Sequence, residues 1–401
     1  MKKNGVGSNR SDPVFLHIRR DMAVIGIDAT SLSIYGKGVS RHQHNLIKSL
    51  AKLDKKNCYY VFLNRKNTLP DLPKQENFSY LRFYITKRII WDQFQLPLAV
   101  RRYKLDIYHS ISDTLPIFSK AKFVLFVAEI PDYRIEPARK DKRISLYARL
   151  SQGYNMFFFR PSLDKAKLII ASSNSTRDDL IHRYKVDKNK IRVLYHAADE
   201  QFCAAGDEKA LLDTQRKYNV EAGYILHISS SDPRDNTCAV IRAYQRARCA
   251  SKIPQKLIIG GNVGLKESGL ERLIRELNLR DSVIFTGRLT EKELVALYQA
   301  ADLFIDPSLY EGFGLQVVEA MSCGIPVITS NLTSLPEIVG DAGILLDPAD
   351  IQGLASTLVR VLTDAQLRSS MRQKSLQRAK FFSWDKTARE TLAIYDELLG
   401  Y

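Results

Sequence analysis

The sequence predicts an α/β protein built from two doubly wound, Rossmann-like domains that face a central cleft. Short apolar runs alternate with segments of helical period from residue 23 to the C-terminus, a pattern typical of parallel sheets covered by helices. A chain of 401 residues with 45% hydrophobic content is also too long for one compact core. The polar stretch 196–209, which contains no strand pattern, separates the two sets of runs.

The domain organisation follows from these patterns. We expect a disordered extension at 1–21, a first domain at 22–200 and a second domain at 205–382. Residues 1–21 are polar and basic and lack the apolar region of a secretory signal. No apolar stretch reaches the roughly 18–20 residues that a bilayer-spanning helix needs. The five scattered cysteines form no C-x-x-C pair, which predicts buried free thiols in a reducing cytoplasm.

Thirteen apolar runs predict strands, and runs that are apolar throughout are typical of strands buried on both faces. In the first half they are 23–27, 59–63, 81–85, 105–109, 123–127, 168–172 and 191–195. In the second half they are 224–228, 256–260, 282–287, 301–307, 325–329 and 343–346. Thr290 begins a helix through a T-x-x-E capping box. Another helix spans about 314–323 and ends at Gly324.

The charge distribution is uneven. Residues 1–200 contain 37 Lys and Arg against 19 Asp and Glu, a balance of +18, whereas the remainder carries −2. This excess favours either solubility and non-specific attraction to polyanions or contact with an anionic lipid surface. The segment 134–160 combines seven basic residues with aromatic ones. It reads either as an interfacial amphipathic helix or as a helix that packs its apolar stripe inward.

The most specific segment is 308–326, which follows a buried strand and enters a helix. Gly312 and Gly314 remove side chains at the turn, so the amides of Phe313, Gly314 and Leu315 are predicted to form an anion site suited to a phosphate. Glu311 and Glu319 flank this site. Carboxylates accept hydrogen bonds from vicinal hydroxyls, so a bound diphosphate would have its sugar near one glutamate and its ribose near the other.

Other classes of site are disfavoured. The sequence contains no D-x-D pair, the motif with which many sugar transferases hold Mg²⁺ or Mn²⁺, so we expect no metal and no cofactor. The first strand is not followed by G-x-G-x-x-G, which disfavours a dehydrogenase. The basic first half shows no nucleic-acid recognition motif.

The run 310–350 resembles the donor-site segment of the retaining glycosyltransferases of family 4, which have the GT-B fold. The likeness extends over about 23–400. It implies that 383–401 form a helix crossing back to complete the first domain. It also implies metal-independent transfer of a hexose, with glucose from UDP-glucose favoured, to a glycan or polyprenyl-diphosphate-linked acceptor. Such an enzyme would serve exopolysaccharide biosynthesis in the cytoplasm, peripherally at the inner face of the membrane.

The resemblance also implies roles for individual residues. Glu311 would hold the donor sugar and Glu319 the nucleotide ribose. The positions that would contact the rest of the donor are Gly312, Phe313, Gly314 and Leu315 at the phosphates, Arg288 and Leu289 at the base, and Gly36 and Gly38 across the cleft.

Two departures from the family pattern affect the expected chemistry. Asp235 stands where family members carry a lysine that neutralises the diphosphate, and we expect the adjacent Arg234 to supply that charge. Ala128 and Glu129 replace a His-Asp pair expected near the sugar. His109, at the end of another predicted strand, is the remaining catalytic candidate.

Two alternatives to transfer stay open. A nucleotide-sugar-binding protein that has lost transfer is suggested by Asp235 and Ala128. A nucleotide-sugar 2-epimerase shares the fold class and would act without an acceptor.

Overall fold

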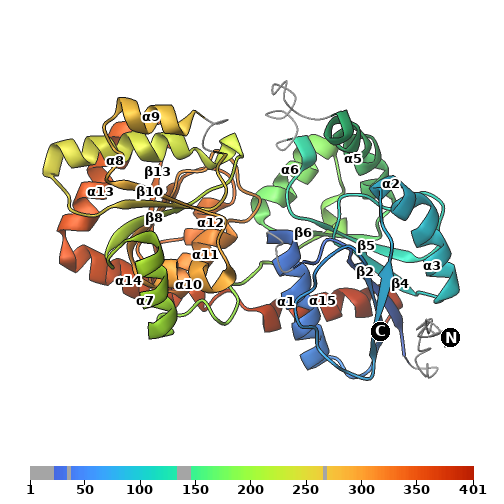
Figure 1. The fold of residues 1–401 in the computed structure, drawn as a ribbon. Coiled ribbons are helices and arrows are strands. Elements are labelled where there is room, and N and C mark those ends of the chain that lie inside the picture. Colours follow the sequence, from blue (N-terminus) through green and yellow to red (C-terminus); the bar gives the residue numbers. More distant parts are fainter. Residues whose placement is uncertain (1–21, 34–37, 133–145, 265–268) are drawn as a thin grey trace, which may run out of the picture. The chain divides into compact units, whose positions relative to one another are not determined.

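The computed structural model describes residues 22–33, 38–132, 146–264 and 269–401 (Figure 1). The predicted extension 1–21, Gly36 and residues 134–145 of the basic segment lie outside the described residues. The chain divides into two compact units. The first comprises Met1–Phe126, Phe157–Ile169 and Thr391–Tyr401, and the second comprises Val127–Met156 and Ile170–Glu390.

The first sheet has seven strands in the order β3-β2-β1-β4-β5-β6-β7. Its strands are β1 (Val24–Ala29), β2 (Cys58–Asn64), β3 (Phe78–Phe83), β4 (Ile107–Ser110), β5 (Lys122–Val127), β6 (Leu168–Ala171) and β7 (Ile191–Val193). Strand β1 pairs in parallel with both β2 and β4, so the strand order reverses at β1. This is the order of a doubly wound sheet.

The helices that accompany this sheet in the chain are α1 (Gly38–Leu53), α2 (Arg88–Ile90), the π-helix η1 (Trp91–Gln95), α3 (Leu96–Arg102), α5 (Leu146–Lys165), α6 (Asn174–Tyr184) and the short η2 (Lys188–Lys190). The core of the first unit is rich in aromatic side chains. Tyr59, Phe62 and Tyr108 are fully buried, and Trp91 packs against Phe62 with ring centroids 5.8 Å apart. The buried rings fix the strands and η1 against one another.

The second sheet has six strands in the order β10-β9-β8-β11-β12-β13. They are β8 (Tyr224–Ile228), β9 (Leu257–Gly260), β10 (Val283–Gly287), β11 (Ala301–Asp306), β12 (Val327–Ser330) and β13 (Ile344–Leu346), and all their pairings are parallel. The order reverses between β8 and β11. Both sheets therefore confirm the predicted fold class of two doubly wound domains.

The helices of the second unit pack an apolar core on this sheet, with α8 and α13 among its main contributors (Figure 1). From residue 208 onwards they are α7 (Glu208–Tyr218), η3 (Pro233–Asp235), α8 (Thr237–Ser251), α9 (Leu270–Glu276), α10 (Glu291–Gln299), α11 (Leu315–Ser322), α12 (Leu335–Val339), α13 (Ile351–Thr363), α14 (Ala365–Ala379) and the start of α15 (Trp384–Leu399). The second unit also includes α6 and η2. The predicted capping box at Thr290 is confirmed, because Thr290 Oγ1 accepts from the Glu293 amide and the Glu293 carboxylate accepts from the Thr290 amide.

The end of α15 belongs to the first unit. Tyr395 lies in its core and Lys122 of β5 donates to the carbonyl of Leu398 at 2.6 Å. These contacts confirm the predicted return of the C-terminal helix. The cysteines are all free, but the expectation that all are buried is wrong, because Cys203, Cys238 and Cys249 are exposed. Among the described residues, no helix has both the length and the apolar character that a membrane span requires.

Candidate functional site

The second sheet offers a ligand site where its strand order reverses. Strands β8 and β11 are neighbours that lead into connections on opposite sides, and ligands of such sheets bind outside the carboxyl ends of the strands at this point. Residues 229–236 follow β8, and residues 307–314 follow β11. The second segment is the one that the sequence predicts to hold a phosphate.

Helix α11 begins with amides that have no internal partner. Gly314 is its N-cap with φ +92°, a conformation that favours glycine, and its carbonyl accepts from Val317 and Val318 at 3.0 and 3.3 Å. Within the described part of the chain, the amides of Phe313, Gly314 and Leu315 donate no hydrogen bond. The helix start therefore presents a row of unsatisfied donors, which the predicted anion site requires.

The loop before α11 is fixed by its contacts with Ala128 and with residues 172–176, which belong to the same unit. The Gly312 carbonyl accepts three hydroxyl hydrogen bonds, which come from Ser172, Ser173 and Thr176 at 2.9, 2.7 and 3.2 Å. A Cβ atom on Gly312 would lie 2.1 Å from the carbonyl oxygen of Ala128. Only glycine fits here, and the close approach holds the backbone of the loop in one position.

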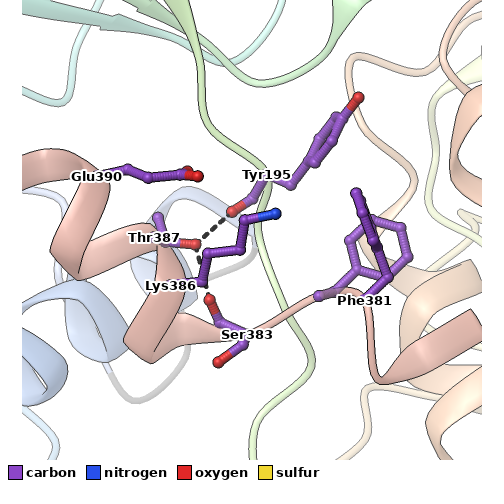
Figure 2. A pocket seen from close by; sticks show the side chains of 7 residues that line it. Tyr195, Phe381, Ser383, Lys386, Thr387 and Glu390 are labelled. Carbon is purple, nitrogen blue, oxygen red and sulfur yellow. Dashed lines mark hydrogen bonds between the residues drawn. The ribbon is translucent and has the colours of Figure 1, made fainter.

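The side chain of Phe313 anchors the loop in an aromatic cluster. Its ring packs on His196 and Phe382 with centroids 4.8 and 5.9 Å apart, and it is 6% exposed. The stretch after β7 is tied to α15, because the Thr387 hydroxyl donates to the Tyr195 carbonyl at 2.6 Å (Figure 2). The side chain of Phe313 is thus structural, and its amide is the group that can bind a ligand.

Glu311 lies among other carboxylates. Its amide donates to Thr333 and its carbonyl accepts from Ser334, which fixes its backbone. Burial is the main cause that raises the pKa of Glu311 well above its usual value, and the charges of Asp306 and Asp235 raise it further. An ionised carboxylate in this environment lowers the stability of the folded protein unless a partner donates hydrogen bonds to it.

Asp306, the last residue of β11, is a site residue that the sequence analysis missed. It is 1% exposed, and its Oδ1 accepts from the Ser308 hydroxyl at 2.5 Å. Burial raises its pKa to about 6, the Ser308 hydrogen bond acts in the opposite direction, and the charge of Asp235 raises the value further. Among the described residues, its Oδ2 has no hydrogen-bond partner. A polar residue that ends an otherwise apolar strand run was the available signal.

Arg234 is already paired in this structure. Its guanidinium donates to Asp232 at 2.7 Å and to Glu129 at 2.8 Å, and it lies over the ring of Tyr310. Both carboxylates raise the pKa of Arg234, although burial lowers it. The neighbouring Asp235 accepts from the amide and the hydroxyl of Ser230 at 2.5 and 2.8 Å. The positive charge predicted to neutralise a diphosphate is therefore present on Arg234, but the carboxylates of Asp232 and Glu129 balance it.

The other predicted residues of the donor site are less tightly grouped. Glu319 lies on α11 and is 1% exposed. Arg288 and Leu289 follow β10, with the Arg288 side chain exposed. Gly38 begins α1 in the first unit, where a Cβ would meet nothing within 4 Å. The structure therefore brings Arg234, Glu311 and the start of α11 together, and places Gly38 in the other unit.

His109 is buried in the first unit. Its Nδ1 pairs with the Tyr395 hydroxyl at 2.8 Å, and its Nε2 has no hydrogen-bond partner among the described residues. Burial lowers its pKa to about 4, so the ring is neutral, although the Asp28 charge acts in the opposite direction. These contacts favour a structural role in holding α15.

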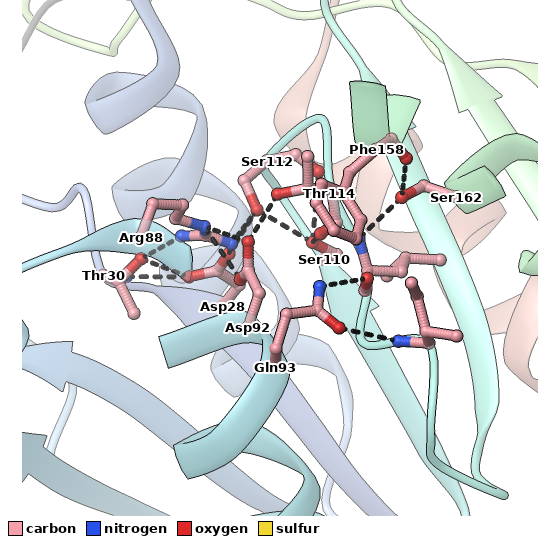
Figure 3. A network of polar contacts seen from close by, with 12 residues as sticks. Asp28, Thr30, Arg88, Asp92, Gln93, Ser110, Ser112, Thr114, Phe158 and Ser162 are labelled. Carbon is pink, nitrogen blue, oxygen red and sulfur yellow. Dashed lines mark hydrogen bonds and ion pairs between the residues drawn. The ribbon is translucent and has the colours of Figure 1, made fainter. Parts of the chain in front are cut away.

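A polar network lies at the carboxyl ends of β1 and β4, the strand that contains His109 (Figure 3). Arg88 donates to Asp28 at 3.0 Å and to Asp92 at 2.9 Å, and Thr114 donates to Asp92 at 2.5 Å. The Arg88 charge and the Thr30 hydrogen bonds lower the pKa of Asp28, although burial alone would raise it. The network ties η1 to the strands of the first sheet.

Two family models together match most of the chain. The model of the Glycosyltransferase Family 4 matches residues 36–202, and the model of the Glycosyl transferases group 1 matches residues 211–378. The first match covers β2 to β7 of the first sheet, and the second covers all six strands of the second sheet. The predicted donor segment 308–326 lies inside the second match.

The chain is also similar to characterised proteins. It is 28% identical over 377 residues to the O-antigen chain mannosyltransferase B of Escherichia coli, covering 89% of this chain and 95% of the relative. The sucrose-phosphate synthase of Thermosynechococcus elongatus has a TM-score of 0.73 and 19% identity, covering 94% of this chain and 99% of its own. The Anabaena protein HepE in complex with UDP-glucose has a TM-score of 0.68 and 17% identity, covering 94% and 100%.

Proposed function

We propose that this chain, which belongs to the glycosyltransferases of the GT-B fold, transfers a hexose from a nucleotide-diphosphate sugar to a glycan or lipid-linked glycan acceptor. The observation that carries the proposal is the row of amides at the start of α11 that donate no hydrogen bond within the described residues. They lie between Glu311 and Glu319, the carboxylates predicted to hold the two sugar rings. A diphosphate would satisfy these donors.

Each predicted residue has a role in this proposal. The amides of Phe313, Gly314 and Leu315 bind the diphosphate, Glu311 accepts from the hexose hydroxyls, and Glu319 accepts from the ribose hydroxyls. Arg234 would exchange Asp232 or Glu129 for a phosphate oxygen, which its planar guanidinium binds in a bidentate manner. The residues proposed to surround the rest of the donor are Arg288, Leu289, Gly36 and Gly38.

The proposed reaction retains the anomeric configuration. The bond between the anomeric carbon and the phosphate oxygen breaks, and the acceptor oxygen bonds to that carbon on the same face. The acceptor hydroxyl gives its proton to a phosphate oxygen, so no protein nucleophile is required. The proposal includes no metal: the sequence has no D-x-D pair, and positive charge at the diphosphate comes from the start of α11 and from Arg234.

The identity of the hexose has two candidates. Mannose is favoured, because a relative that matches 89% of this chain is an O-antigen chain mannosyltransferase. Glucose carried by UDP is the candidate that the sequence analysis favours, and a protein of similar fold binds UDP-glucose. We propose mannosyl transfer in polysaccharide biosynthesis, at the cytoplasmic face of a membrane, with glucosyl transfer as the second candidate.

A nucleotide screen tests the donor site. Guanosine and uridine diphosphates, free and linked to mannose or glucose, are added to the chain and the melting temperature is measured, since a ligand of the folded state raises it. Glu319→Ala is expected to weaken binding of the stabilising nucleotide about tenfold or more, because hydrogen bonds to a charged group are lost. Ser322→Ala, in the last turn of α11, is the matched control and is expected to bind normally. Equal binding by both variants would place the ribose elsewhere.

Product analysis separates the alternatives. A transferase releases free nucleotide diphosphate slowly without acceptor, whereas an epimerase returns an intact nucleotide sugar of altered configuration. A protein that only binds does neither. Release that is unchanged in both Glu311→Ala and Arg234→Ala would rule out catalysis at this site.

Tyr395→Phe tests the role of His109. The substitution leaves the buried Nδ1 of His109 without its partner at 2.8 Å, so the free energy of unfolding is expected to fall by about 1–2 kcal/mol. The rate of nucleotide release at neutral pH is expected to stay within about twofold, because the ring is already neutral. Denaturant titration and the release assay give the two values. A large loss of rate with little loss of stability would make His109 catalytic.

A further inference from the structure

An apolar ridge covers the outer face of the helix formed by α2, η1 and α3. Ile90, Phe94 and Leu98 are spaced four residues apart and are 40%, 66% and 69% exposed. Residues at this spacing share one face of a helix. Exposed apolar residues scattered singly need no explanation, but a continuous row marks a contact surface.

The opposite face of this helix is firmly buried, so the ridge is a fixed feature. Trp91 and Leu96 are fully buried, and the Arg88 pair with Asp92 joins the network of Figure 3. Pro97 has no amide to donate to the carbonyl four residues earlier, and the Leu96 amide bonds to Trp91, five residues back. This π-turn sets the register that directs Phe94 and Leu98 outward.

A neighbouring loop extends the ridge. Ile117 and Phe118 are 40% and 85% exposed. The loop is held beside η1, because the Gln93 side chain donates to the Leu115 carbonyl at 3.2 Å and accepts from the Ile117 amide at 3.0 Å. We call Ile90, Phe94, Leu98, Ile117 and Phe118 the apolar ridge.

The exposed charges of the two segments that carry the apolar ridge are of one sign. The exposed ionisable residues of 87–104 and 115–120, all within the described residues, are Lys87, Arg101, Arg102, Lys104 and Lys120. The acidic residue of these segments, Asp92, is buried and paired with Arg88. The ridge is therefore apolar at its centre and basic at its rim.

We infer that the apolar ridge docks the first unit on an anionic lipid bilayer. The inference rests on the proposed function for its purpose, since a lipid-linked acceptor lies in a membrane. Aromatic and aliphatic side chains enter the boundary between headgroups and acyl chains, and the basic rim pairs with anionic headgroups. A second copy of the chain fits less well, because a symmetric contact would set one basic rim against another.

Vesicle co-sedimentation of the full chain tests the inference. The vesicles are phosphatidylcholine alone or with 30% phosphatidylglycerol, at low and high salt. The unaltered chain is expected to partition onto the anionic vesicles and to be released by salt. Phe94→Ser combined with Phe118→Ser is expected to lower partitioning at least tenfold on vesicles of both compositions. Arg101→Glu combined with Lys120→Glu is expected to lower partitioning at least tenfold, and only on the anionic vesicles. The estimate assumes a loss of about fivefold for each basic residue removed.

A matched pair of single variants controls for general loss of apolar surface. Leu98→Ser is expected to weaken partitioning severalfold, whereas Leu212→Ser, at an exposed leucine of α7 in the second unit, is expected to leave it unchanged. Equal partitioning by both leucine variants would overturn the inference. So would a dimer in sedimentation velocity that Phe94→Ser abolishes, since the ridge would then be covered by a second copy.

The failure of this inference is separable from failure of the proposed function. The ridge lies outside the donor site, so the ridge variants are expected to keep the nucleotide-induced rise in melting temperature. Normal vesicle binding without any rise in melting temperature on adding nucleotides would contradict the proposed function and leave the docking surface supported. A normal rise in melting temperature without vesicle binding would contradict the docking surface and leave the proposed function supported.

Discussion

Glu311→Gln is expected to lower kcat/KM for transfer about a hundredfold or more while making the folded protein more stable at neutral pH. The activity falls because a carboxylate that accepts from two sugar hydroxyls contributes about 1.5–3 kcal/mol through each charged hydrogen bond. The stability rises because Glu311 is crowded by Asp306 and Asp235, and an amide removes that repulsion. A residue kept for folding alone would show the opposite change in stability.

The pH dependence of stability independently checks that Glu311→Gln stabilises the folded protein. The pKa of Glu311 is higher in the folded state than in the unfolded chain, so its ionisation costs stability as the pH rises above the unfolded value. The stabilisation by Glu311→Gln should therefore be absent at low pH and should grow towards neutral pH. Denaturant titrations across this range, with the conservative Asp substitution at 311 as control, measure it. A variant that is less stable at neutral pH, or retains activity within threefold, would contradict the proposed role.

The strands were predictable because their burial on both faces makes them apolar throughout. Strand β8 has the predicted limits, 224–228, and the other strands of the second sheet differ by at most two residues at either end. The least accurate strand is β3, predicted at 81–85 and found at Phe78–Phe83. It lies at the edge of the first sheet and is mostly only partly buried, so its sequence carries a weaker apolar signal.

The helix of α2, η1 and α3 was not among the helices predicted, and its sequence lacks a clear helical pattern. Pro97 and the π-turn at Trp91–Gln95 break the 3.6-residue period that identifies a helix. Exposed Phe94 and Leu98 then blur the contrast between the buried and the outer face. The same irregularity creates the apolar ridge.

At the candidate site, the sequence predicted the groups that are close in the chain. The glycines and the amides of 312–315 follow from local backbone rules, and the structure has them as expected. The ion pair of Arg234 with Glu129 joins residues 105 positions apart, and no spacing rule reveals such a contact. The sequence signal for Asp306 was only its place at the end of an apolar strand run, and its closeness to Asp235 and Glu311 appears only in the structure.

Gly312→Ala is expected to lower kcat/KM for transfer about a hundredfold and the free energy of unfolding by about 1–3 kcal/mol. The new Cβ would stand 2.1 Å from the Ala128 carbonyl oxygen and 2.9 Å from the Glu129 Cβ, so the backbone itself must move. Overpacking of this kind costs about 1–3 kcal/mol. A displacement of about 1 Å in groups that hold a substrate costs about a hundredfold in rate.

The control is Gly153→Ala in α5, where an added Cβ meets nothing within 4 Å. It is expected to leave activity unchanged and to add about 0.5–1 kcal/mol of helix stability. Nucleotide binding by Gly312→Ala separates two causes, since a moved loop also moves the amides of Phe313 and Gly314. Weak binding together with weak transfer is the expected result. Full binding with lost transfer would mean that the amides stay in place and that Glu311 alone is displaced from the sugar.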